Sequence, residues 1–151
     1  MMDEIRDLYQ QVILDHNKNP HNFHKMDDAD SALEGFNPLC GDHYTFYVKF
    51  DGETIADVSF EGSGCAISKA SASIMSTALK GRTRAEAERL FELFTSIVTG
   101  KIDVVEHVAE LGKLAAFAGV AEFPVRVKCA TLPWHTLHGA LQGGATRVST
   151  E

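Results

Sequence analysis

Four side chains in this sequence are suited to one shared chemical site: Cys40, Asp42, Cys65 and Cys129. The three cysteines are the only ones in the chain of 151 residues, and they lie far apart. An odd number of dispersed cysteines is a poor basis for a disulfide framework in a domain of this length. Thiol or metal chemistry is therefore the favoured interpretation. The alternative is three buried cysteines that act as small hydrophobic side chains.

The local sequence around each cysteine favours a positioned thiol. Cys40 stands between Pro38 and Gly41 on a constrained turn before a predicted strand, and if Cys40 and Asp42 are both extended their side chains leave the same side of the backbone. We expect Cys65, after a Gly-Ser-Gly loop, and Cys129, after a predicted strand, to stand at the first turn of a helix. The helix dipole and free N–H groups there favour a thiolate. None of the three lies in an apolar stripe, but no CxxC pair fixes two ligands locally.

Zinc suits such a set, because it takes four tetrahedral ligands drawn from thiolate, imidazole and carboxylate. Three thiolates and the Asp42 carboxylate carry four negative charges, so Zn²⁺ leaves two; Arg126 and Lys128 could offset part of them, or could face solvent from an edge strand. A carboxylate is the harder ligand among soft thiolates, which permits one ligand to exchange. A thiolate released by that exchange would be a nucleophile able to attack the sulfur of a persulfide.

The elements that must position these residues follow from the spacing of apolar side chains. The predicted strands are Ser31–Asn37, Tyr44–Phe50 and Ile55–Phe60, with a turn at Asp51-Gly52 between the last two and a short extended segment at Val125–Lys128. Two predicted helices span Asp3–His16 and Cys65–Ala78. A third begins at a capping box formed by Thr83 and Glu86 and reaches Val98. A fourth holds Leu111, Leu114, Ala115 and Ala118, and a fifth begins at Cys129.

These elements predict an α+β fold, in which a small three-stranded antiparallel sheet is packed with about five or six helices. The length is that of one domain, and we expect a single domain over residues 1–143 with a flexible tail at 144–151.

Composition limits the classes of function. The net charge of −7 and scattered basic residues argue against a nucleic-acid-binding protein. No apolar run approaches the roughly 20 residues that span a bilayer, which predicts a cytoplasmic protein without membrane contact. His16, His21 and His24 are irregularly spaced among polar residues around Pro20, so we interpret them as a solvated loop and not as metal ligands.

Three motifs together resemble the IscU-like superfamily, which is similar to NifU N-terminal domains. They are Asn37-Pro38-Leu39-Cys40-Gly41-Asp42, Gly62-Ser63-Gly64-Cys65-Ala66-Ile67-Ser68, and Val127-Lys128-Cys129-Ala130-Thr131-Leu132-Pro133-Trp134. The resemblance covers almost the whole chain. In the IscU-type branch a His usually precedes the third cysteine. Lys128 at that position, and the longer segment between the second and third cysteines, resemble the SufU-type branch.

Resemblance to SufU-type proteins implies a zinc-dependent sulfurtransferase in iron–sulfur cluster assembly. Such a protein accepts persulfide sulfur from a SufS-like, pyridoxal-phosphate-dependent (PLP) cysteine desulfurase, stimulates that enzyme and supplies the downstream assembly machinery. By the same analogy Cys40 is the acceptor, and Asp42, Cys65 and Cys129 retain zinc while a desulfurase histidine replaces Cys40. Arg126 then helps to hold the freed thiolate.

Three alternatives remain open. An IscU-type scaffold would assemble an iron–sulfur cluster on the same residues, and a zinc-stabilised interaction domain would have a closed structural site without sulfur chemistry. A cysteine hydrolase is disfavoured, because the sequence pairs no histidine with a particular thiol.

Overall fold

The computed structural model describes residues 2–38, 41–142 and 147–149. Its elements, in chain order, are α1 (Met2–Lys18), β1 (Ser31–Asn37), β2 (Asp42–Asp51), β3 (Thr54–Ser63), α2 (Ala66–Leu79), α3 (Arg84–Val98), the 3₁₀ helix η1 (Val104–His107), α4 (Val108–Leu111), the 3₁₀ helix η2 (Gly112–Glu122), α5 (Pro124–Gln142) and β4 (Arg147–Ser149). No helix in this described part of the chain is long and apolar enough to cross a membrane.

The predicted three-stranded antiparallel sheet is confirmed, and β1 has the predicted bounds. β2 and β3 form a hairpin whose turn contains Gly52 at φ +61°, a conformation that glycine adopts without steric cost. β1 pairs with β2 so that Asn37 lies opposite Asp42. The structure adds β4, which pairs parallel with β1 and gives the order β3-β2-β1-β4. We predicted a flexible tail in this region, and the sequence pattern did not indicate the pairing.

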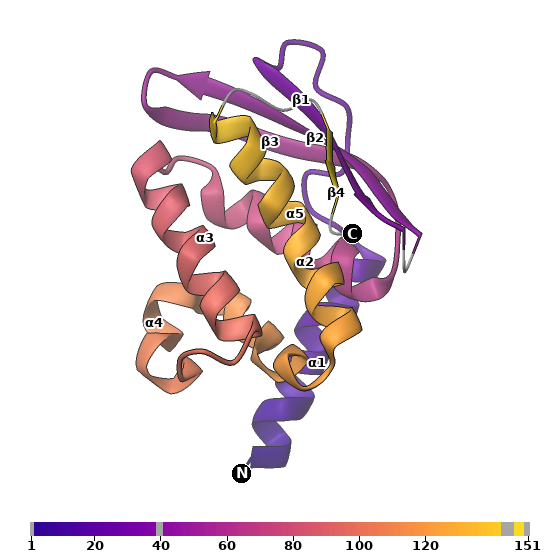
Figure 1. Ribbon diagram of the computed structural model, residues 1–151, viewed down its shortest axis with the longest axis vertical. Helices are drawn as coiled ribbons and strands as arrows, with labels where there is room; N and C mark the ends of the chain where they lie inside the picture. The colour runs from indigo at the N-terminus through magenta and orange to yellow at the C-terminus, as the bar shows by residue number, and fades with distance from the viewer. Residues whose placement is uncertain (1, 39–40, 143–146, 150–151) are drawn as a thin grey trace.

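Helices α2 and α5 lie beside each other against one face of the sheet, and α3 and η2 pack further from it, as Figure 1 shows. Residues Ala70 to Ser76 of α2 are all buried, so this helix is the centre of the core. α5 comes close to β1 at Gly35, where a Cβ atom would lie 2.2 Å from Thr136 Oγ1. A glycine is therefore needed there for the helix to reach the sheet. The α+β fold class is confirmed.

The starts of three helices follow local sequence rules, with one correction. Thr83 caps α3 in the predicted capping box, and Cys65 is the N-cap of α2. The strand predicted at residues 125–128 is wrong, because α5 begins at Pro124, a residue favoured at the first helical position. Cys129 therefore does not open α5 but is its sixth residue. An alternation of four residues is too short to distinguish a strand from the start of a helix.

The single helix predicted around Leu111 and Ala118 is also wrong in form. The chain there makes the short α4 and then η2, with Gly112 between them at φ +57°. A positive φ is incompatible with a continuing right-handed α-helix. Leu114 and Ala115 are nevertheless buried, as the apolar spacing indicates.

The predicted solvation of His16 is a further correction, since this residue of α1 is only 4% exposed. Its Nδ1 atom lies 2.7 Å from Ser73 Oγ on α2, and its ring stacks on that of His21. Burial lowers the pKa of His16, and the neighbouring His21 lowers it further. His21 and His24 are exposed, as expected for a loop.

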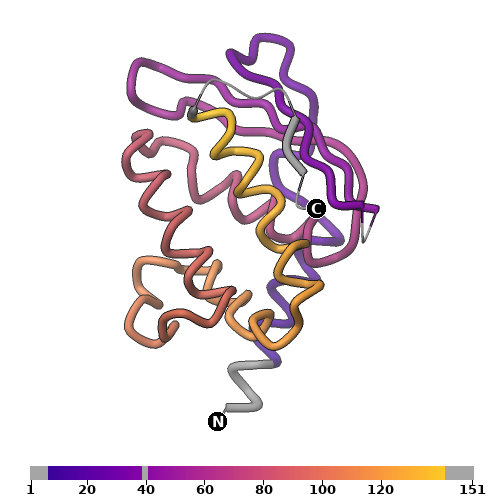
Figure 2. Tube along the Cα trace, viewed as in Figure 1, coloured from indigo at the N-terminus to yellow at the C-terminus, as the bar shows by residue number. Residues whose placement is uncertain are grey.

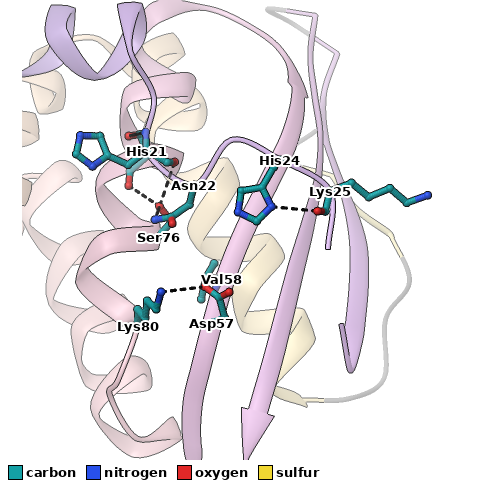
Figure 3. Close-up of polar contacts among 9 residues, drawn as sticks. His21, Asn22, His24, Lys25, Asp57, Val58, Ser76 and Lys80 are labelled. Atoms are coloured by element: carbon teal, nitrogen blue, oxygen red, sulfur yellow. Dashed lines mark hydrogen bonds and ion pairs between the residues drawn. The ribbon is translucent and has the colours of Figure 1, made fainter. Parts of the chain in front are cut away.

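Buried serines of α2 also anchor the loop after α1. The His21 backbone N–H donates to Ser73 Oγ at 2.8 Å, and Asn22 Nδ2 donates to Ser76 Oγ at 2.9 Å. Figure 3 shows the loop against α2 at Ser76, with Lys80 reaching Asp57 of β3 nearby. The tube in Figure 2 shows the chain passing from α1 into this loop and on to the sheet. The C-terminal end of α1 is therefore the part fixed to the core.

Candidate metal centre

Three of the four predicted side chains meet where the sheet approaches α2 and α5. Asp42 is the first residue of β2, Cys65 caps α2, and Cys129 lies in α5. One oxygen of Asp42 and the two sulfur atoms all lie within 4.8 Å of one another. Within residues 2–38, 41–142 and 147–149 this is the one group of three or more such side chains close enough to hold a metal ion. Cys40, the fourth predicted member, lies outside the described residues.

Both carboxylate oxygens of Asp42 accept hydrogen bonds. The Cys65 backbone N–H donates to Oδ1 at 2.8 Å, and Asn37 Nδ2 donates to Oδ2 at 3.3 Å. The residue is fully buried, so these donors compensate for the loss of water around its carboxylate. Each oxygen keeps lone pairs for a further ligand, because an ionised carboxylate has about four acceptor sites. The carboxylate orientation is thus fixed by two different elements.

The Cys65 thiol has the environment that the sequence predicts for a helix N-terminus. Its Sγ accepts a hydrogen bond of 3.4 Å from the Ser68 backbone N–H, and the Ser68 hydroxyl lies 2.8 Å from the Tyr44 hydroxyl. The hydrogen bond with Cys129 lowers the pKa of Cys65 to about 6, against the opposing effect of burial. Cys65 is half-buried and so is also the more accessible of the two described thiols.

Cys129 has a different environment from the predicted one. It is 1% exposed and is the sixth residue of α5, so it does not share the free N–H groups of a helix start. Asn37 Nδ2 donates to its Sγ at 3.5 Å, across 92 residues of sequence. The Cys129 sulfur is therefore contacted by a hydrogen-bond donor of another element and not by the free N–H groups of a helix start.

Residues that surround the ligands were not singled out from the sequence. Asn37 donates to two of them, and Tyr44 and Ser68 form the hydrogen-bonded pair beside Cys65. A Cβ atom at Gly64 would lie 2.5 Å from both Asp42 Oδ1 and Tyr44 Oη. The motifs contain Asn37, Gly64 and Ser68 but not Tyr44, and a sequence pattern does not specify which side chains meet across strands and helices.

The donor set fits zinc. Bonds of about 2.3 Å to sulfur and about 2.0–2.2 Å to oxygen place neighbouring ligand atoms of a tetrahedron about 3.5–3.8 Å apart. The three atoms, within 4.8 Å of one another, need only a small contraction to reach that spacing. Thiolates also favour zinc or iron over magnesium or calcium, which prefer oxygen ligands. A four-coordinate ion would need one more ligand, and Cys40 is predicted to supply it.

The two predicted basic partners lie on the first turns of α5. Arg126 is exposed, with its guanidinium 5.5 Å from the centre of the Phe123 ring, and Lys128 is half-exposed. Compensation of the site's charge by these side chains, and a role for Arg126 in sulfur transfer, stay predictions.

Comparisons with known proteins agree with the fold and with the motifs. The family described as NifU-like N terminal domain matches residues 8–130. The zinc-dependent sulfurtransferase SufU of Bacillus subtilis is 42% identical over 130 residues, which cover 86% of this chain and 86% of that protein. The iron–sulfur cluster assembly scaffold protein IscU of Streptococcus pyogenes serotype M1 is 40% identical over 144 residues, covering 95% and 89%.

A solved structure is also similar. It is a candidate iron–sulfur cluster assembly scaffold protein for the SUF system from Fervidobacterium islandicum AW-1, with a TM-score of 0.81 and 40% identity. The match covers 87% of this chain and 94% of that one. The predicted resemblance to the IscU-like superfamily is confirmed, and the similar proteins include one named SufU and one named IscU.

Proposed function

This chain belongs to the family of NifU-like N-terminal domains, and from that membership we propose that it is a zinc-dependent sulfurtransferase of iron–sulfur cluster biogenesis. The observation that carries the proposal is the meeting of Asp42, Cys65 and Cys129 within 4.8 Å. The relative with this activity in its name, SufU of Bacillus subtilis, supports the finer assignment.

In this function Asp42, Cys65, Cys129 and Cys40 hold Zn²⁺. The bound ion would keep the thiols deprotonated and would couple metal affinity to folding. Cys65 is suited to ligation because its pKa is already lowered to about 6, so little free energy is needed to form its thiolate near neutral pH. The two hydrogen bonds on Asp42 keep its carboxylate directed at the same centre.

Sulfur transfer requires one free thiolate, and we assign that role to Cys40, which a histidine of the desulfurase would replace at the zinc. The partner is a PLP-dependent, SufS-like cysteine desulfurase that carries a persulfide on its own cysteine. The Cys40 thiolate attacks the outer sulfur, a new S–S bond forms on Cys40, and the electron pair of the broken S–S bond returns to the desulfurase sulfur as a thiolate. The exchange has no net oxidation. Arg126, three residues before Cys129, would stabilise the Cys40 thiolate before attack.

Lys128 supports the sulfurtransferase over the scaffold. The IscU-type resemblance leads us to expect a histidine before the third cysteine, and an imidazole there would offer another metal ligand. A lysine is a poor ligand while protonated, so the ligand set lacks that imidazole. The persulfide sulfur would pass onward to downstream assembly machinery. We place the protein in the cytoplasm, where thiols are kept reduced.

A second function is supported by the 40% identical relative that is named as an IscU scaffold. In that case Asp42 and the thiolates would hold an iron–sulfur cluster during its assembly, since cluster iron is also bound by cysteine thiolates. The arrangement of Asp42, Cys65 and Cys129 fits either a zinc ion or an iron–sulfur cluster. The two functions differ in whether the metal stays in the site or leaves with sulfide.

One experiment separates these functions. Metal content is measured in protein purified without added iron, and desulfurase turnover is measured with and without the protein and its Cys40→Ala variant. A sulfurtransferase holds close to one zinc per chain and stimulates turnover, and Cys40→Ala still folds but does not stimulate. Stimulation by Cys40→Ala equal to that of the unchanged protein would exclude the acceptor role. An iron–sulfur chromophore that forms on anaerobic reconstitution and passes to an apo-protein would favour the scaffold.

A further inference from the structure

We propose that Asn37 is a positioning residue of the metal centre, whose side-chain amide holds Asp42 and Cys129 at the spacing that a metal ion requires. The proposal rests on the proposed metal site and adds a residue that does not itself bind the metal. It assigns a specific task to a buried polar side chain at the end of a strand.

The position of Asn37 is determined by the sheet. It is the last residue of β1, its Cα is paired with that of Asp42, and its side chain is fully buried. Nδ2 lies 3.3 Å from Asp42 Oδ2 and 3.5 Å from Cys129 Sγ. A side-chain amide has two N–H donors in one plane, so one nitrogen can serve both acceptors at once.

The two acceptors are the groups that most need such a donor. A carboxylate and a thiolate that are both buried repel each other, and the repulsion is larger where water is excluded. An amide between them offers N–H dipoles without adding a charge of its own. Without that donor, the favoured change is for the two groups to move apart, which would widen the ligand spacing and oppose metal binding.

Asn37 also completes a chain of hydrogen bonds through all three described ligands. Cys129 Sγ accepts from Asn37, Asn37 donates to Asp42, and Asp42 accepts from the Cys65 backbone N–H at 2.8 Å. These bonds join β1, β2, α5 and the N-cap of α2. The ligand spacing is thus established by protein groups, and the metal enters a site that is already formed.

The test uses two variants that keep the shape of the side chain and remove its donor. Asn37→Leu is apolar, and Asn37→Asp presents a carboxylate. Each full-length apo protein is titrated with Co²⁺, whose d–d and thiolate charge-transfer bands report the geometry and number of thiolate ligands. Affinity for Zn²⁺ is measured against a chromophoric chelator, and thermal unfolding of the apo protein is recorded in parallel. Thr136→Val is the control, because it removes a buried hydroxyl from α5 near β1 but contacts none of the three ligands.

The expected result is a loss of roughly 10- to 100-fold in Zn²⁺ affinity for the Asn37 variants, the range typical of residues that orient metal ligands. Their cobalt bands should shift or lose thiolate intensity, whereas Thr136→Val keeps the original spectrum and affinity. Cobalt and zinc binding of unchanged strength, or tighter, in either folded Asn37 variant would overturn the proposal. If the unchanged protein itself bound neither metal, that result would contradict the proposed metal site as a whole and not only the role of Asn37.

A measurement on the unchanged protein decides the matter if neither variant folds. The two Nδ2 protons of Asn37 donate to two atoms that we propose as metal ligands, so both resonances should move when Zn²⁺ is added to the ¹⁵N-labelled apo protein. They should also exchange slowly with solvent. Asn37 resonances that do not move while the metal binds stoichiometrically would contradict the role.

Discussion

Gly64→Ala is the sharpest test of how closely the centre is packed. The added Cβ would lie 2.5 Å from Asp42 Oδ1, 2.5 Å from Tyr44 Oη and 2.7 Å from Ser68 Oγ. Real Cβ contacts essentially never fall below 3.0 Å, so these atoms must move by about 0.5 Å. All three are polar atoms engaged in short hydrogen bonds, and none is the free end of a flexible side chain. The substitution therefore disturbs hydrogen bonds as well as packing.

The cost can be worked out from these contacts. Overpacking a buried site costs about 1–3 kcal/mol, and weakening the bond from the Cys65 N–H to the Asp42 carboxylate adds a part of the about 1.5–3 kcal/mol typical of bonds to charged groups. We expect a loss of roughly 2–3 kcal/mol in the free energy of unfolding of the apo protein. For a chain of this size that lowers Tm by about 4–12 °C. Zinc affinity should fall by roughly 10- to 100-fold as the carboxylate turns away.

The assay combines thermal unfolding of the apo protein with zinc competition against a chelator. Gly119→Ala is the matched control, because a Cβ there meets nothing within 4 Å and Gly119 is not at a positive φ. Its Tm and zinc affinity should stay close to those of the unchanged protein. If Gly64→Ala kept both values as well as Gly119→Ala does, the described packing around Asp42 would be refuted.

Three further predictions concern the fold. Gly35→Ala, whose Cβ would lie 2.2 Å from Thr136 Oγ1, should lower Tm, and adding Thr136→Ala should restore part of the loss in thermal melts of the two variants. Burial lowers the pKa of His16 below 6.5, so the unfolded chain binds more protons than the folded one, and stability falls as the pH drops below about 6.5. His16→Gln should make stability less dependent on pH in this range, by at most about 1.4 kcal/mol per pH unit, as measured by urea titrations at several pH values. Thr83→Ala removes the cap of α3 and should cost about 1 kcal/mol in the same titrations, and an unchanged midpoint would count against the cap.

The sequence was sufficient where a local rule determines structure. Alternation and turn residues located three strands, and the bounds of β1 were met at both ends. Thr83 and Glu86 marked the start of α3 because both hydrogen bonds of a capping box are made within four residues. Cys65 was placed at a helix N-terminus by the glycine-rich loop before it. In each case the deciding interactions lie within a few residues.

The sequence was insufficient where partners are distant. His16 reads as a loop residue until Ser73, 57 residues away, gives its ring a buried partner. Pro124 marks a helix start, but the alternation that follows it indicated a strand. The convergence of Asp42, Cys65 and Cys129 was expected, whereas metal binding itself stays a prediction, as do the roles of Cys40 and Arg126. Asn37 could not be found by any local signal, because its two acceptors come from different elements.

The wide spacing of the centre along the chain has a consequence for its biosynthesis. Asp42 and Cys65 are made well before Cys129, which follows Cys65 by 64 residues. At the about 5–20 residues per second of translation, that interval lasts roughly 3–13 s. A nascent chain that ends before α5 lacks both Cys129 and the hydrogen bond from Asn37 that orients it. A metal ion that needs all three of these ligands would thus be held only after α5 has been made, and a tightly held ion would mark a chain that has completed its core.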